Sequence, residues 1–108
     1  MTKIRLSPEY NCNPIWDDIH GGDYEEDELR DKLGLDIFLI SDLKLLQNMW
    51  DATYVANDPH SSGFKTEKEQ FEFDIFALNL VWELQQQLPN YRISFYSVYF
   101  KQEVVLGN

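Results

Sequence analysis

Several short segments of the chain alternate apolar and polar residues with the period of a β-strand. Residues 3–6 place two apolar side chains on one side, and Pro8 ends the alternation, as expected for a short strand. Residues 14–16 predict a second short strand before a Gly-Gly turn signal. Residues 91–100 are rich in aromatic and β-branched side chains, which favour strands, and a short final strand is expected at residues 104–106.

Two longer segments between these strands have helical periodicity instead. Ser41 is a suitable N-cap for the first helix, and Pro59 ends that segment. One face of this helix would carry Leu46, Met49, Trp50, Thr53 and Tyr54. Thr66 and Glu69 form a capping box for the second helix, which extends to Gln87. Its apolar surface is so wide that the helix should contact both a sheet and another helix.

The order β-β-α-α-β predicts an α+β fold, with two helices packed on one face of a short, mainly antiparallel sheet. The chain has 108 residues, and no linker divides it, so we expect a single α+β domain over residues 1–108. Hydrophobic residues make up 44% of the chain and aromatic residues 15%, which is enough for one core and argues against intrinsic disorder.

The charge balance excludes several classes of partner. Nine Lys and Arg residues oppose 19 Asp and Glu residues, a formal net charge of −10. Direct binding of nucleic acid or of an anionic membrane surface is therefore not expected, because both depend on cationic side chains. The longest apolar run, residues 37–40, is far too short to span a bilayer, and no apolar signal segment follows the first basic residues. With Cys12 as the only cysteine, we expect a reduced, cytoplasmic compartment.

Catalytic motifs are missing from the sequence. It contains no glycine-rich phosphate loop and no nucleophile elbow. Cys12 lies among acidic residues, which raise a thiol pKa and oppose thiolate chemistry. A metal-dependent hydrolase using Asp17, Asp18, His20 and Asp23 is one hypothesis, but their spacing does not match a calcium loop, and no second His or Cys cluster completes a zinc site. We therefore expect no metal, no cofactor and no enzymatic activity.

Acidic residues are concentrated in one part of the chain. Between Leu6 and Arg30 there are eight acids and no Lys or Arg. Such a segment repels itself, so a solvated loop or a short surface helix is expected. It could serve only to keep the protein soluble, or it could be a docking surface whose negative potential steers a basic partner. Interspersed apolar side chains favour docking, because hot spots combine aromatic anchors with a polar rim; they are Tyr10, Trp16, Ile19 and Tyr24.

Several segments together resemble a group of small acidic bacterial proteins, the immunity proteins of contact-dependent growth inhibition and other polymorphic toxin systems. The segments are residues 3–10 with Pro14-Ile15-Trp16, the helix start Ser41-Asp42-Leu43, the stretch from Trp50 to Tyr54, and the loop from Asp58-Pro59 to Ser62-Gly63-Phe64. The resemblance implies a cytoplasmic protein that binds one cognate toxin domain, often a nuclease, and blocks it. Because immunity families differ widely in fold, the resemblance assigns no toxin-contact residues.

The charge density instead predicts the binding residues. It is highest over residues 17–28, where a Gly-Gly pair would let the loop adapt to a partner. The predicted binding residues are Asp17, Asp18, Asp23, Tyr24, Glu25, Glu26, Asp27 and Glu28, with the tyrosine as an anchor. A basic nuclease domain of the toxin is the expected partner. The alternative is a non-catalytic adaptor that binds a folded protein through its helices, in which case Trp50, Trp82 or Phe71 should be exposed.

Overall fold

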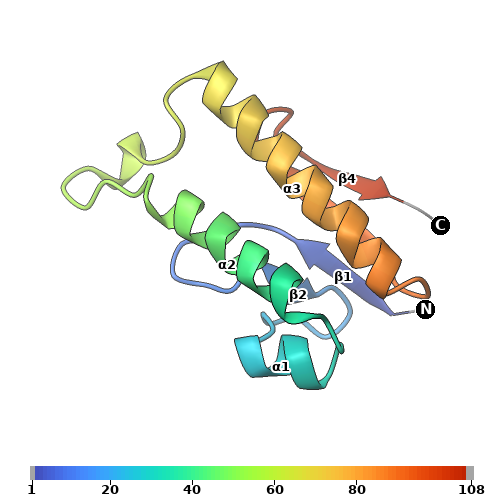
Figure 1. Ribbon diagram of the computed structural model, residues 1–108. Helices are drawn as coiled ribbons and strands as arrows, with labels where there is room; N and C mark the ends of the chain where they lie inside the picture. The colour runs from blue at the N-terminus through green and yellow to red at the C-terminus, as the bar shows by residue number, and fades with distance from the viewer. Residues whose placement is uncertain (1, 107–108) are drawn as a thin grey trace.

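A four-stranded sheet with helices on one of its faces forms the fold (Figure 1). The computed structural model describes residues 2–106, so residues 1, 107 and 108 of the predicted domain lie outside the described part. The elements in chain order are β1 (Lys3–Leu6), β2 (Ile15–Asp17), α1 (Glu26–Asp31), α2 (Ile37–Asp51), a 3-10 turn (Pro59–Ser61), α3 (Glu67–Gln87), β3 (Arg92–Ser97) and β4 (Gln102–Leu106). This order confirms the predicted α+β class. It adds α1 within the acidic segment, and β4 occupies the place of the short final strand.

The strand order in the sheet is β2-β1-β3-β4. β1 pairs antiparallel with β2, and β3 pairs antiparallel with β4, in agreement with a mainly antiparallel sheet. The central pair, β1 and β3, is parallel, because the chain passes through all the helices between these strands and returns in the same direction. Ile4 lies opposite Ile93, and Leu6 lies opposite Phe95. The buried side chains of the two central strands therefore share one face.

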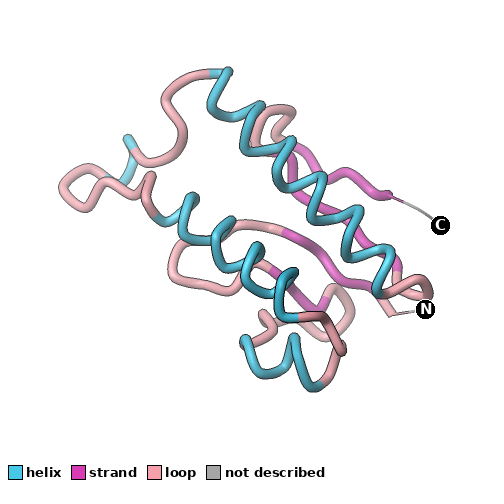
Figure 2. Tube along the Cα trace, in the orientation of Figure 1, coloured by secondary structure: helices cyan, strands magenta, loops and turns pink. Residues whose placement is uncertain are grey.

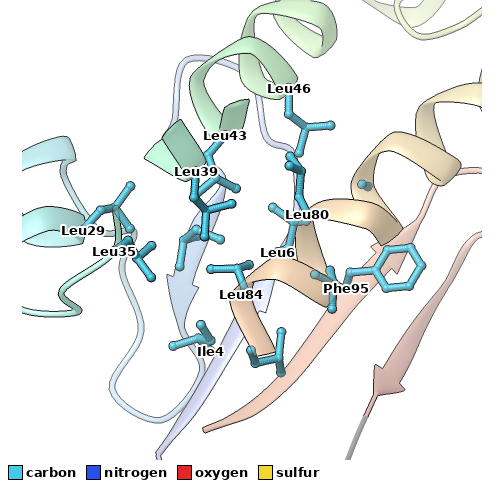
Figure 3. Packing of buried hydrophobic residues seen from close by; sticks show 14 of the residues in the cluster. Ile4, Leu6, Leu29, Leu35, Leu39, Leu43, Leu46, Leu80, Leu84 and Phe95 are labelled. Carbon is cyan, nitrogen blue, oxygen red and sulfur yellow. The ribbon is translucent and has the colours of Figure 1, made fainter. Parts of the chain in front are cut away.

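The core lies between that face of the sheet and the two long helices, which lie side by side and run in opposite directions (Figure 2). Figure 3 shows leucine side chains of α2 and α3, among them Leu43 and Leu84, gathered with Ile4 and Leu6 of β1. Leu29 attaches the short helix α1 to the same cluster. Burying a side chain of this size stabilises the fold by about 1.5–3 kcal/mol relative to leaving it exposed, so this cluster is the main source of stability.

The helix α2 begins and ends earlier than the sequence pattern predicts. The Asp36 carboxylate accepts a hydrogen bond from the Leu39 amide at 2.8 Å, so Asp36 is the N-cap and the prediction of Ser41 is wrong. Both residue types can cap a helix, and burial of Leu39 and Ile40 against the core decides between them. The helix ends at Asp51, and turns connect it to the 3-10 segment that contains Pro59.

The helix α3 begins where the sequence predicts. The Thr66 hydroxyl accepts from the Glu69 amide at 3.1 Å, which confirms the cap. The second half of the capping box differs, since the Glu69 carboxylate accepts from the Thr66 hydroxyl at 3.0 Å instead of from the Thr66 amide. As expected from its wide apolar surface, α3 contacts both β3 and α2. Among residues 2–106, no helix is long and apolar enough to cross a membrane.

Candidate functional site

The acidic span of residues 17–28 folds as a tight turn followed by the start of α1. Gly21 and Gly22 have φ angles of 85° and 84°, a left-handed conformation that is strained for residues with a side chain. The Asp17 amide donates to the Gly22 carbonyl at 2.9 Å, which closes the turn. The expected short surface helix is therefore present, and it begins at Glu26.

Two of the predicted binding acids hold the turn together. The Asp17 carboxylate accepts from the backbone amides of His20 and Ile19, each at 2.9 Å. These two bonds, the one from His20 first, lower the pKa of Asp17. The Asp23 carboxylate accepts from the Asn13 amide at 2.8 Å and so attaches the turn to the preceding loop. Both side chains thus have structural partners inside the protein.

Two further acids pair with cations of the same chain. Asp18 lies 3.2 Å from the Arg5 guanidinium. Glu28 lies 2.7 Å from the Lys32 ammonium, and it also accepts from the Glu25 amide at 3.0 Å. The hydrogen bond from Lys32 is the main cause of the lowered pKa of Glu28, and the bond from the Glu25 amide is the second. These pairs reduce the charge that either acid offers to a partner.

The other three acids point into solvent at the start of α1. Glu25, Glu26 and Asp27 are all exposed. Glu25 is the N-cap of α1 and forms a capping box with Glu28, and its side chain also accepts a long hydrogen bond of 3.4 Å from the Asn13 side chain. Glu26 lies 3.8 Å from Lys44, and both side chains are about two-thirds exposed (64% and 66%). Exposed pairs of this kind contribute little to stability, so these three carboxylates are the most available part of the acidic span.

The aromatic residues of the span are less available than the acids. Tyr24 is half-buried and packs against the core cluster, and burial raises the pKa of its phenol. Trp16 donates its indole N–H to the Ser7 carbonyl at 2.8 Å, while its ring lies under the Arg5 guanidinium. Ile19 is the exposed apolar side chain in this turn. The turn therefore presents Ile19 and carboxylates, with Tyr24 packed behind them.

The residues considered for metal and thiol chemistry do not form a reactive site. Within residues 2–106, no three His, Cys, Asp or Glu side chains converge as metal ligands. Asp17 and His20 contact each other at 3.2 Å, whereas Asp18 and Asp23 bind Arg5 and Asn13. Burial first, and then the neighbouring carboxylates, raise the pKa of the Cys12 thiol. This direction is the one expected from the acidic neighbours, and it keeps the thiol protonated.

The helical face named for the alternative function is also open to solvent. Trp82 is 67% exposed and Phe71 is 49% exposed, whereas Trp50 is half-buried against Tyr10 and Phe64. The exposed apolar residues of α3 recur at helical spacing and form the α3 stripe, which consists of Phe71, Ile75, Leu78 and Trp82. The sequence signal for this stripe was the width of the apolar surface on the second helix.

Two buried polar residues escape the sequence patterns. Asp74 on α3 accepts from the Ser97 hydroxyl at 2.5 Å and from the Val98 amide at 2.9 Å, which positions the turn between β3 and β4. Gln47 on α2 is only 7% exposed and donates to the Glu9 carbonyl. In the sequence, each of these two residues stands next to a core residue. That position predicts a buried polar side chain only weakly, because the groups that hydrogen-bond to it are distant in the sequence.

Of the comparisons with known proteins, one assigns the chain to a family. No curated protein sequence matches the chain. A family model described as Serratia CdiI immunity protein-like matches residues 2–98, which include every described element except β4. The match confirms the resemblance to immunity proteins of contact-dependent growth inhibition. The chain therefore belongs to the Serratia CdiI immunity protein-like family, whose members are non-catalytic proteins that neutralise a cognate CdiA toxin.

Proposed function

We propose that this immunity protein binds a cationic nuclease domain of its cognate toxin through the acidic span of residues 17–28. The observation that carries the proposal is the group of three exposed carboxylates at the start of α1, Glu25, Glu26 and Asp27, in a protein of net charge −10. The other acids, Asp17, Asp18, Asp23 and Glu28, add negative potential while they shape the turn, and Tyr24 supports it from behind.

The charge of the surface suits a nuclease on physical grounds. A nuclease active site is positively charged because it must hold phosphates, so a concentrated negative potential attracts it and raises the rate of encounter. Each carboxylate at the rim of such an interface contributes modestly. A carboxylate buried against an Arg or Lys of the toxin would cost about 2–5 kcal/mol when truncated, because its partner would be left unpaired.

The test removes the three exposed charges, keeps a side-chain acceptor at the Glu25 cap, and leaves the other four acids in place. The variant carries Glu25→Gln, Glu26→Gln and Asp27→Asn. We expect its affinity for the cognate toxin domain to fall at least tenfold, or about 1.4 kcal/mol, as measured by titration calorimetry. Growth rescue by co-expression with the toxin should weaken in parallel. Circular dichroism should show an unchanged fold, since these side chains are exposed.

A matched control distinguishes local docking from overall charge. Glu67→Gln, Glu72→Gln and Glu83→Gln remove three exposed charges from α3, so both variants have the same net charge. Docking at α1 predicts that the control variant keeps its affinity. Equal losses in both variants would contradict a local site. An unchanged affinity in the α1 variant would instead move the interface to the α3 stripe, the face of the alternative hypothesis, where Trp82 is the exposed residue type most typical of hot spots.

A further inference from the structure

A pocket of about 160 Å³ lies between α1, α2 and the loop before β2. Leu29, Ile40 and Leu43 form its apolar walls, while Glu26 and Lys44 also line it. A cavity of about 150 Å³ holds one molecule the size of benzene, so this pocket has room for the end of a single side chain. It is too small for a cofactor, because ligand pockets usually measure about 300–1,000 Å³.

Gln47 lines this pocket and carries an unsatisfied hydrogen-bond acceptor. Its Nε2 group donates to the Glu9 carbonyl at 2.8 Å and to the Asp51 carboxylate at 3.0 Å. Because both amide hydrogens are used, the orientation of the amide is determined and Oε1 is the remaining atom. Within the described residues, this buried Oε1 has no hydrogen-bond partner. This atom has almost no accessible surface, so a donor in the pocket reaches it only after the Gln47 side chain shifts toward the pocket. Buried acceptors are rarely left unpaired in proteins, and such a shift would give this one a partner that the isolated chain lacks.

The charges of the pocket select the kind of donor. The Glu26 carboxylate favours a cation, and its present partner, Lys44, is held only by an exposed contact of 3.8 Å. An incoming cation can therefore replace Lys44 at little cost. The apolar walls suit an aliphatic stem behind the charged group. Arginine combines such a stem with five N–H donors, so one guanidinium can serve a neutral acceptor and a carboxylate together.

We propose that this pocket receives an arginine side chain of the toxin, whose guanidinium donates to Gln47 Oε1 and replaces Lys44 beside Glu26. The inference rests on the proposed function, because it requires a basic partner at this surface. Long-range attraction between charges does not determine how the two proteins are oriented. An arginine bound in this pocket would fix that orientation at one point of the interface. The two charged residues of the pocket are expected to act in opposite directions, since Glu26 attracts the guanidinium and Lys44 competes with it.

The first experiment uses methylguanidinium as the probe and observes the ¹⁵N-labelled protein by NMR. We expect saturable shifts of the Gln47 side-chain amide and of the backbone amides around it, with an affinity in the millimolar range. The shifts should weaken severalfold in Glu26→Gln and strengthen in Lys44→Gln. Glu83→Gln on α3 is the matched control and should behave as the wild type. No shift at Gln47, or equal shifts in wild type and Glu26→Gln, would overturn the proposal.

The second experiment adds the toxin domain to the same labelled protein. The Gln47 side-chain amide should shift when the complex forms, and Lys44→Gln should bind the toxin several times more tightly. A complex in which the Gln47 resonance is unchanged would show that the toxin places no side chain in the pocket. Failure of the proposed function has a different result, namely unchanged toxin affinity in the variant that lacks the three α1 charges. The response to methylguanidinium is independent of that outcome.

Discussion

At the scale of single residues, polar side chains with backbone partners position turns that apolar packing alone would leave undetermined. Asp74 is 8% exposed, yet it serves three donors, the Ser97 hydroxyl and the backbone amides of Val98 and Tyr99. These donors lie at the last residue of β3 and in the turn that follows it, so a single carboxylate on α3 positions the turn that leads into β4. Asp17 does the same for the turn after β2 with two backbone amides.

Replacement of Asp74 should therefore destabilise the protein strongly. In Asp74→Ala, the Ser97 hydroxyl and two backbone amides lose a charged acceptor, and the free energy of unfolding should fall by about 3 kcal/mol. Urea denaturation measures this change. Glu72→Ala, an exposed position on the same helix, should stay within about 0.5 kcal/mol of the wild type. A similar small change in Asp74→Ala would show that water replaces the carboxylate.

At the scale of elements, α3 has two apolar faces with different roles. One face carries Phe73, Leu80 and Leu84 into the core against the sheet and α2. The α3 stripe lies on a second face, exposed to solvent. Folding of an amphipathic helix requires only the face that packs in the core. The α3 stripe is therefore available to contact another molecule. Its exposure can be measured without a partner.

Trp82 should dominate the quenching of tryptophan fluorescence by acrylamide. It is 67% exposed, whereas Trp16 and Trp50 are half-buried and in contact with other side chains. The Trp82→Phe variant should therefore lose most of the readily quenched emission and show a smaller Stern–Volmer slope. Trp16→Phe, the comparison variant, should keep the steep slope. The same slope in wild type and Trp82→Phe would mean that the stripe is covered in solution.

At the scale of the whole molecule, the excess of acidic residues produces a field that extends beyond any single contact. Among residues 2–106, five Lys or Arg side chains pair with carboxylates and His20 contacts Asp17, so only some of the 19 acidic residues have such a partner. The uncompensated charge gives a negative potential at long range. Such a field acts mainly on the rate of association, while short-range contacts in the bound complex determine the rate of dissociation.

Salt should accordingly slow the association of this protein with a basic toxin domain. The Debye length is about 8 Å at physiological ionic strength, so added salt screens the field over the approach distance. Stopped-flow measurements should show an association rate that falls steeply with ionic strength and a dissociation rate that changes little. The variant without the three α1 charges should show a shallower dependence. An association rate independent of salt would exclude electrostatic steering for this pair.

The sequence by itself determined the parts of the structure that depend on neighbours within a few residues. The alternation at residues 3–6 and the apolar and β-branched residues near 91–100 predicted β1 and β3, because side-chain period follows directly from backbone geometry. The Thr66 cap of α3 was predicted because its partner is three residues away. The resemblance to immunity proteins covered segments that the family model also spans, while the prediction that the acidic chain does not bind nucleic acid directly stays a prediction.

Only the tertiary structure decided what depends on distant partners. Asp36 and Ser41 are both able to cap a helix. The helix begins after Asp36 because this start buries Leu39 in the core. The parallel pairing of β1 with β3 joins strands separated by the whole helical region. In the same way, the acids of residues 17–28 look equivalent in sequence, yet folding brings Arg5 to Asp18 and Asn13 to Asp23. It leaves Glu25, Glu26 and Asp27 exposed, because no local rule specifies which carboxylate meets a partner from another element.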